Sequence, residues 1–171
     1  GINTIRSRNE CTPIKIIASG MITSECGLLN LDHITAPAGV SELNMSAAEK
    51  IFPEISDIPF VFVRGIMLQG ESLESCDIMR GEETEIFGIS DFDGVFVLTG
   101  SHSKIITVKD GKIERFKTML TGEMLESLAS DTILSAILDL KSDLSLEYLV
   151  KGYEYCKLHG INEALFKVRV L

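Results

Sequence analysis

Apolar and polar residues alternate most regularly in the middle of the chain, where three short segments show the period of two that is typical of β-strands. The segments are 94–98, 104–109 and 112–119. Asp110 and Gly111 join the last two, and an Asp-Gly pair in this position is a strong signal for a tight β-hairpin. A polar break at 100–103 separates the first two. The pattern therefore predicts a β-turn-β-hairpin-β unit.

Other segments are typical of buried strands or of helices. Apolar runs at 13–19 and 59–63 predict strands, and each begins at a proline. The stretches 21–40 and 65–77 predict loops or short edge strands. Helix signals occur at 47–52, 81–88, 122–130, 131–140, 144–159 and 162–169, and residues 2–10 are consistent with the end of another helix. This mixture places the chain in the α/β class.

Charge and composition exclude several kinds of partner. The chain has 16 basic and 25 acidic residues, a net charge of −9 and no basic patch, which argues against nucleic acid. No apolar run reaches the roughly 20 residues of a membrane span, and the N-terminus lacks the apolar segment of a signal peptide. The four cysteines are scattered without a C-x-x-C pair, as expected of reduced thiols. We therefore expect a cytoplasmic protein that binds small molecules, and homodimerisation stays open.

The break at 100–103 is a candidate anion site. Gly100 allows close approach of the backbone, and backbone N–H groups at a tight turn can point at an anion. The hydroxyls of Ser101 and Ser103 and the ring of His102 would add donors. The spacing of a P-loop is absent. The alternative is an ordinary hairpin with a polar tip.

A second candidate site is the predicted helix start at 80–84. Glu82 and Glu83 could act as a general base if a substrate hydroxyl lies within hydrogen-bond reach. Arg80 beside them could bind an anionic substrate through two parallel hydrogen bonds. The alternative is surface charge that opens a helix. Neither His33 nor His159 has a ligand partner nearby in the sequence, so we predict no metal-ligating residues.

Four stretches of the chain together resemble one enzyme family, the 2-dehydro-3-deoxygalactonokinases, also called 2-keto-3-deoxygalactonate kinases. The stretches are ASGMITSECGL (18–28), DIMRGEETEIFG (77–88), GVFVLTGSHSKIITVKDGKIERFKTMLTGEML (94–125) and LFKVR (165–169). They are similar to the family's A-G-M-x-[GT]-S-x-x-G, M-R-G-E-E-T, G-T-H-S-K-W and T-G-E-[LM] motifs. Ile105 stands where the family has tryptophan, and the chain contains no tryptophan.

The resemblance implies an actin- and hexokinase-like fold of two ribonuclease-H-like lobes. Residues 1–75 would be the remainder of the N-terminal lobe and residues 76–171 the first part of the C-terminal lobe. The implied reaction is transfer of the γ-phosphoryl group of ATP, with Mg²⁺, to the 6-hydroxyl of 2-dehydro-3-deoxy-D-galactonate. The family's Asp-x-Gly-x-Thr hairpin is absent, so we expect an internal fragment that is inactive alone.

The resemblance also implies roles for individual residues. Glu82 would be the general base, with Glu83 as its rival. The remaining residues implied are Gly100, Ser101, His102 and Ser103 for the ATP phosphates, Arg80 for the substrate carboxylate, and Ser19, Gly20, Met21 and Ser24 for the sugar-acid pocket. Two alternatives remain: a non-enzymatic module that binds an anion or a protein, and a kinase of the same superfamily for another sugar acid.

Overall fold

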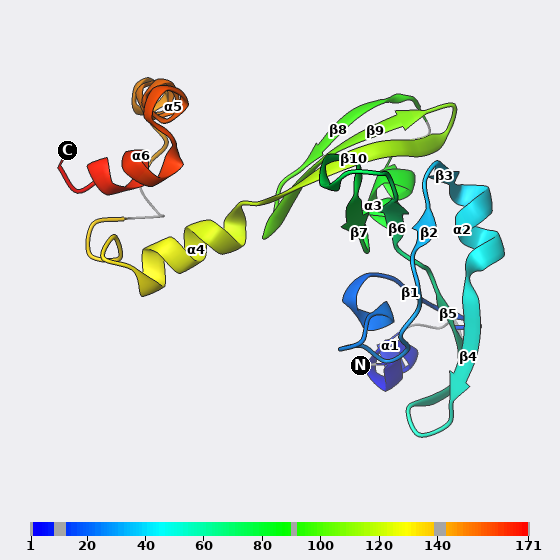
Figure 1. Cartoon of the computed structure of the whole chain (residues 1–171). Helices are drawn as coiled ribbons and strands as arrows, with labels where there is room; N and C mark the ends of the chain where they lie inside the picture. The colour runs from blue at the N-terminus through cyan, green and yellow to red at the C-terminus, as the bar shows by residue number, and fades with distance from the viewer. Residues whose placement is uncertain (1, 9–12, 90–91, 139–142, 171) are drawn as a thin grey trace. The chain divides into compact units, whose positions relative to one another are not determined.

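The computed structural model describes residues 2–8, 13–89, 92–138 and 143–170 (Figure 1). It has a mixed α/β structure, as the sequence pattern predicts. The chain divides into two compact units, residues 1–119 and 120–171. Within the described ranges, no helix is both long enough and apolar enough to cross a membrane.

The main sheet of residues 1–119 is the one that the sequence predicts most clearly. β8 (Gly94–Leu98), β9 (His102–Lys109) and β10 (Lys112–Leu120) run side by side, and the short β3 (Ala38–Gly39) pairs with the other edge of β10 (Figure 1). β8 and β9 are antiparallel. The predicted β-turn-β-hairpin-β unit is thus confirmed.

The main core lies between this sheet and a helix. α3 (Glu82–Ile89) buries Ile86 among apolar side chains of β9 and β10, so the helix predicted to begin after Gly81 is confirmed. The buried cluster is Ala38, Leu43, Ile66, Met79, Ile86, Ile106, Val108, Ile113 and Phe116. Full burial of a leucine, isoleucine, valine, methionine or phenylalanine side chain stabilises a fold by about 1.5–3 kcal/mol. This packing fixes α3 against the sheet.

A second sheet has the order β1-β5-β4. β1 (Ile16–Ala18) is parallel to β5 (Ser56–Phe62), which confirms the strands predicted at 13–19 and 59–63. Its apolar residues form a separate cluster. The fully or nearly buried members of that cluster are Ala18, Phe52, Phe60 and Phe62.

The helix predicted at 47–52 is wrong. These residues form β4 (Ala48–Phe52), antiparallel to β5, and the helix α2 (Val40–Ser46) comes one segment earlier. Alanine, glutamate and lysine favour a helix at 48–50 on local grounds. The ring of Phe52, however, lies with its centroid 5.6 Å from that of Phe60, and this long-range packing overrides the local preference.

The third sheet has the order β2-β6-β7 and lies in stretches that the sequence leaves irregular. β2 is Ile34–Thr35, β6 is Ile66–Leu68, and β7 is Asp77–Met79; the 3₁₀ turns η1 and η2 span Gly20–Thr23 and Leu73–Ser75. Three residues or fewer per strand leave too little alternation to detect. The lobe boundary at residue 75 stays a prediction.

Beyond β10, all regular elements among the described residues are helices. α4 (Gly122–Asp131), α5 (Leu146–His159) and α6 (Ile161–Lys167) correspond to predicted helices, as does α1 (Ile2–Arg8) at the other end of the sequence. The helix predicted at 131–140 is wrong where the structure describes it. Thr132 has extended backbone angles (φ −118°, ψ 174°), so α4 ends there and turns follow to residue 137. Residues 139 and 140 lie outside the described ranges.

Candidate active site

The amino-terminal end of α3 meets the segment 19–24 through two glycines. Gly81 has φ +117° and Gly20 has φ +81°, which are backbone conformations that residues with a Cβ rarely adopt. A Cβ added to Gly81 would lie 3.2 Å from the Cα of Gly20. The two motifs, 60 residues apart in the sequence, therefore touch backbone to backbone.

Hydroxyl groups extend this contact. The Oγ1 of Thr84 donates to the carbonyl of Gly81 at 2.6 Å and lies 3.0 Å from the Oγ of Ser19. Because the Thr84 proton is already used, Ser19 is the donor in that pair. Of the other residues predicted for the sugar-acid pocket, Met21 is exposed, and Ser24 donates its hydroxyl to the carbonyl of Met21.

Arg80 anchors residues 20–33, which we call the η1 loop. One terminal nitrogen of its guanidinium donates to the carbonyl and the hydroxyl of Thr23, at 2.6 Å and 2.7 Å. The other donates to the carbonyl of Leu31 at 2.9 Å and lies 3.3 Å from the Nδ1 of His33. Burial and the nearby guanidinium lower the pKa of His33, which suits Nδ1 as an acceptor. These contacts use four of the five N–H donors of Arg80, so its predicted contact with a substrate carboxylate has only Nε available.

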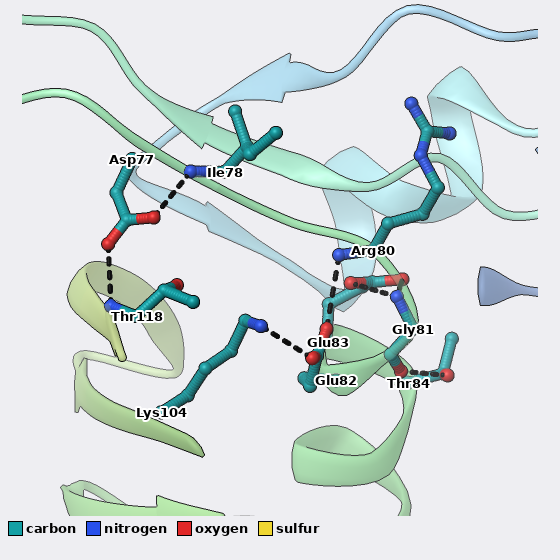
Figure 2. Close-up of polar contacts among 9 residues, drawn as sticks. All are labelled: Asp77, Ile78, Arg80, Gly81, Glu82, Glu83, Thr84, Lys104 and Thr118. Carbon is teal, nitrogen blue, oxygen red and sulfur yellow. Dashed lines mark hydrogen bonds and ion pairs between the residues drawn. The ribbon is translucent and has the colours of Figure 1, made fainter. Parts of the chain in front are cut away.

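Glu82 and Lys104 form an ion pair that joins α3 to β9. The Nζ of Lys104 lies 2.7 Å from Oε1 of Glu82, and the side chains are only 4% and 23% exposed (Figure 2). The Oε2 of Glu82 accepts a hydrogen bond from the backbone N–H of Arg80 at 3.1 Å. Each carboxylate oxygen therefore has one fixed partner and keeps a further acceptor site.

Glu83 is fully buried and has a different role. Both of its carboxylate oxygens lie 2.8 Å from the backbone nitrogen of Gly81, which donates to them at the helix start (Figure 2). Burial raises the pKa of Glu83 despite these hydrogen bonds. Of the two residues predicted as the base, Glu82 is therefore the accessible one and Glu83 is not.

The predicted phosphate turn is shorter than expected. Gly100 and Ser101 form the bend between β8 and β9, whereas His102 and Ser103 are already strand residues. Gly100 has no unusual φ, and a Cβ added there would meet nothing within 4 Å. The fold therefore does not require glycine at this position. Lys104, which follows Ser103, connects the strand that leaves this bend to the start of α3.

Two contributors to the site were missed by sequence reasoning, Lys104 and Asp77. Asp77 accepts hydrogen bonds from the backbone N–H groups of Ile78 and Thr118, both at 2.7 Å, and so links β7 to β10 (Figure 2). The buried Oγ1 of Thr118 has no hydrogen-bond partner among the described residues. Lys104 carries a detectable signal: it is a charged residue at an inward position of a strand that is otherwise apolar on that face.

The described residues contain no group of three or more His, Cys, Asp or Glu side chains arranged to hold a metal ion. The carboxylate of Asp93 accepts hydrogen bonds from the backbone N–H groups of Asp110 and Gly111 at 2.8 Å and 3.0 Å. It thereby supports the β9–β10 turn.

Comparison with known proteins decides the family. The model of the family described as 2-keto-3-deoxy-galactonokinase matches residues 3–171. The chain belongs to the 2-keto-3-deoxy-galactonokinase family. It is 30% identical over 128 residues to a Rhizobium meliloti protein named "Probable 2-dehydro-3-deoxygalactonokinase", and 25% identical over 134 residues to the 2-dehydro-3-deoxygalactonokinase of Escherichia coli. These matches cover 71% and 75% of the chain but 40% and 41% of the relatives.

A solved structure shares the fold of this chain. The crystal structure of a "putative 2-dehydro-3-deoxygalactonokinase protein" from Sinorhizobium meliloti superimposes with a TM-score of 0.79. The match covers 98% of this chain and 56% of that one, at 23% sequence identity. The chain thus spans about two fifths of the length of the curated relatives that it matches and little more than half of this structural neighbour.

Proposed function

We propose that the full-length protein transfers the γ-phosphoryl group of ATP to the 6-hydroxyl of 2-dehydro-3-deoxy-D-galactonate. Family membership supports a sugar-acid kinase. The observation that carries the proposal is the Glu82–Lys104 contact, because it joins the start of α3 to the strand that leaves the bend at Gly100. A kinase needs these two elements together: a group that orients the acceptor hydroxyl, and a backbone bend that holds phosphates.

Glu82 is the residue that we propose orients the 6-hydroxyl. Its carboxylate is partly exposed, and each oxygen has room for one more hydrogen bond. In phosphoryl transfer through a loose transition state, the acceptor hydroxyl loses little of its proton before the phosphoryl group arrives, so a strong base is not needed. A carboxylate that is held in place by two hydrogen-bond donors is therefore adequate to orient the hydroxyl and to accept its proton late in the reaction.

The bend at 100–103 is the proposed phosphate site. ATP would supply the phosphoryl group, and Mg²⁺ would neutralise charge on its phosphate oxygens. The residues present fit phosphate. The fold does not require glycine at position 100, so its small size is available for close approach of a ligand, and the donors of Ser101, His102 and Ser103 follow it. The described residues contain no group of three or more His, Cys, Asp or Glu side chains that could hold a metal ion, so we propose that Mg²⁺ is held chiefly by the phosphates of the nucleotide.

The sugar-acid pocket is proposed at the contact between the η1 loop and α3. Ser19 and Gly20 lie against Gly81 and Thr84 there, and the Nε of Arg80 is the donor left for a carboxylate. Met21 and Ser24 belong to the same loop and remain candidates for the pocket wall.

The test is a coupled assay of the full-length protein with ATP and 2-dehydro-3-deoxy-D-galactonate. We expect Glu82→Gln to lower kcat by about 10²–10⁴-fold, the usual contribution of a general base, with little change in KM for ATP. Glu83→Gln should retain far more activity. Wild-type turnover with other keto-deoxy sugar acids but not with the galactonate derivative would overturn the substrate, and no turnover with any would overturn the proposal. Residues 1–171 alone should show no turnover.

A further inference from the structure

Lys104 occupies a position where the fold would accept an apolar residue. Along β9 the inward side chains are Lys104, Ile106 and Val108, and all three are buried. The lysine side chain is 4% exposed, and removing an ammonium group from water is costly unless it is paired. Buried ion pairs are often no more stabilising than apolar residues of similar volume. Stability alone therefore does not account for a lysine here.

The partner of this lysine does not need it for stability either. Glu82 lies in the first turn of α3, where the helix dipole already favours a negative charge. The Oε2 of Glu82 is held by the N–H of Arg80, and only Oε1 points to Lys104. Two donors, one from the turn just before α3 and one from β9, thus hold opposite oxygens of one carboxylate (Figure 2). Such an arrangement fixes the rotation of the carboxylate plane as well as its position.

We propose that Lys104 is a positioning residue for phosphoryl transfer, which fixes the Glu82 carboxylate relative to the bend at 100–103. The inference rests on the proposed function of Glu82 as the group that orients the acceptor hydroxyl. Lys104 acts through Glu82 and does not contact the substrate. Apolar packing holds α3 against the sheet, and the ion pair from β9 then fixes where the Glu82 carboxylate lies relative to the bend. A displacement of about 1 Å at such a site costs on the order of 10²-fold in rate.

The experiment compares four variants in the full-length enzyme: Lys104→Met, Lys104→Arg, Glu82→Gln and the control Lys112→Met. Lys112 lies in β10 of the same sheet and forms an ion pair with Glu42 of α2, and both side chains are more exposed, at 44% and 32%. We expect Lys104→Met to lower kcat on the order of 10²-fold with KM for ATP within about threefold. Lys104→Arg should recover part of that loss, because it keeps the charge. The control should stay within about twofold of wild type in both constants.

The split between kcat and KM separates positioning from a merely structural role. A positioning residue acts on the chemical step, so Lys104→Met should lower kcat while KM for ATP and for the sugar acid stays close to the wild-type value. The double variant Glu82→Gln/Lys104→Met should be no slower than Glu82→Gln alone, because Lys104 acts through Glu82. Full activity of Lys104→Met would overturn the inference, as would a double variant that suffers the full product of the two single losses.

The same set distinguishes failure of the inference from failure of the proposed function. If Glu82→Gln is fully active, Glu82 is not the orienting group and the proposed function fails at that residue. If Glu82→Gln is inactive while Lys104→Met keeps wild-type kcat, only the role of Lys104 is refuted. Should Lys104→Met not fold, Lys104→Gln carries the same comparison, since it removes the charge but keeps a polar group of similar length.

Discussion

Replacement of Glu83 tests how the amino-terminal end of α3 is stabilised. Its side chain is fully buried, and both carboxylate oxygens accept from the N–H of Gly81. Glu83→Ala leaves that N–H without its acceptor, which costs about 1–3 kcal/mol, and removes one buried methylene group, worth about 0.8 kcal/mol. Removing the carboxylate also removes the cost of burying its charge, which offsets part of this sum. We expect Glu83→Ala to lower the free energy of unfolding by roughly 2 kcal/mol at pH 7.

Glu83→Gln should behave differently. The amide oxygen still accepts from Gly81, and no charge is buried, so we expect a change within about 1 kcal/mol at pH 7. The sign of the pH effect follows from the raised pKa of Glu83, which burial causes. Between the unfolded and the folded pKa the native state binds more protons, so wild-type stability is complete below this window and decreases as the pH rises through it. The glutamine variant lacks this loss and should gain on wild type as the pH rises.

The assay is urea unfolding of the chain followed by circular dichroism at several pH values between 4 and 7. Glu85→Ala is the matched control, because Glu85 lies exposed in the same helical turn and should change stability by less than about 0.5 kcal/mol. Two results would refute the reasoning. One is a glutamine variant as unstable as the alanine variant at pH 7. The other is a wild-type advantage over glutamine that grows as the pH rises.

Three further predictions concern the surroundings of the site. Gly81→Ala should lower the free energy of unfolding by about 1–3 kcal/mol, because φ at Gly81 is +117° and the new Cβ would lie 3.2 Å from the Cα of Gly20. The control is Gly88→Ala, where the new Cβ would meet nothing within 4 Å, and it should stabilise α3 slightly in the same urea assay. Arg80→Lys should speed amide hydrogen exchange in the η1 loop but not in α5, because lysine cannot reproduce four directed hydrogen bonds. Backbone N–H donors lower the pKa of Asp93, so its support of the β9–β10 turn exists above the unfolded pKa and is lost as the pH falls through the folded one. The amide protection factors at that turn, which correct for the intrinsic pH dependence of exchange, should fall in acid in wild type and stay constant in Asp93→Asn.

The parts of the fold that the sequence predicts well depend on local signals. The Asp110-Gly111 turn and the alternating strands beside it need only neighbours in the chain to be recognised. The same is true of α3, which begins directly after Gly81 with acids in its first turn. For the candidate site, local motifs point to the acidic pair at 82–83 and to the bend that contains Gly100, and their roles stay predictions.

The parts that could not be predicted depend on contacts between distant segments. β4 has the composition of a helix and becomes a strand because β5, and the phenylalanine cluster with it, lies beside it. Likewise, nothing in the sequence around Glu82 reveals that Lys104 is its partner, since the pair exists only when β9 packs against α3. Sequence reasoning assigned the guanidinium of Arg80 to a substrate, whereas the structure uses most of it to hold Thr23 and Leu31.

These long-range contacts share one short segment, 80–84, so we expect this segment to tolerate few substitutions. Arg80 holds the η1 loop, Gly81 accepts the close approach of Gly20, Glu82 binds Lys104, and Glu83 closes the helix end on which the others depend. A change at any of these positions moves the carboxylate of Glu82 relative to the loop, to β9, or to both. Substitutions here should therefore reduce turnover even where the unfolding free energy is unchanged, because the site requires three segments in register at once.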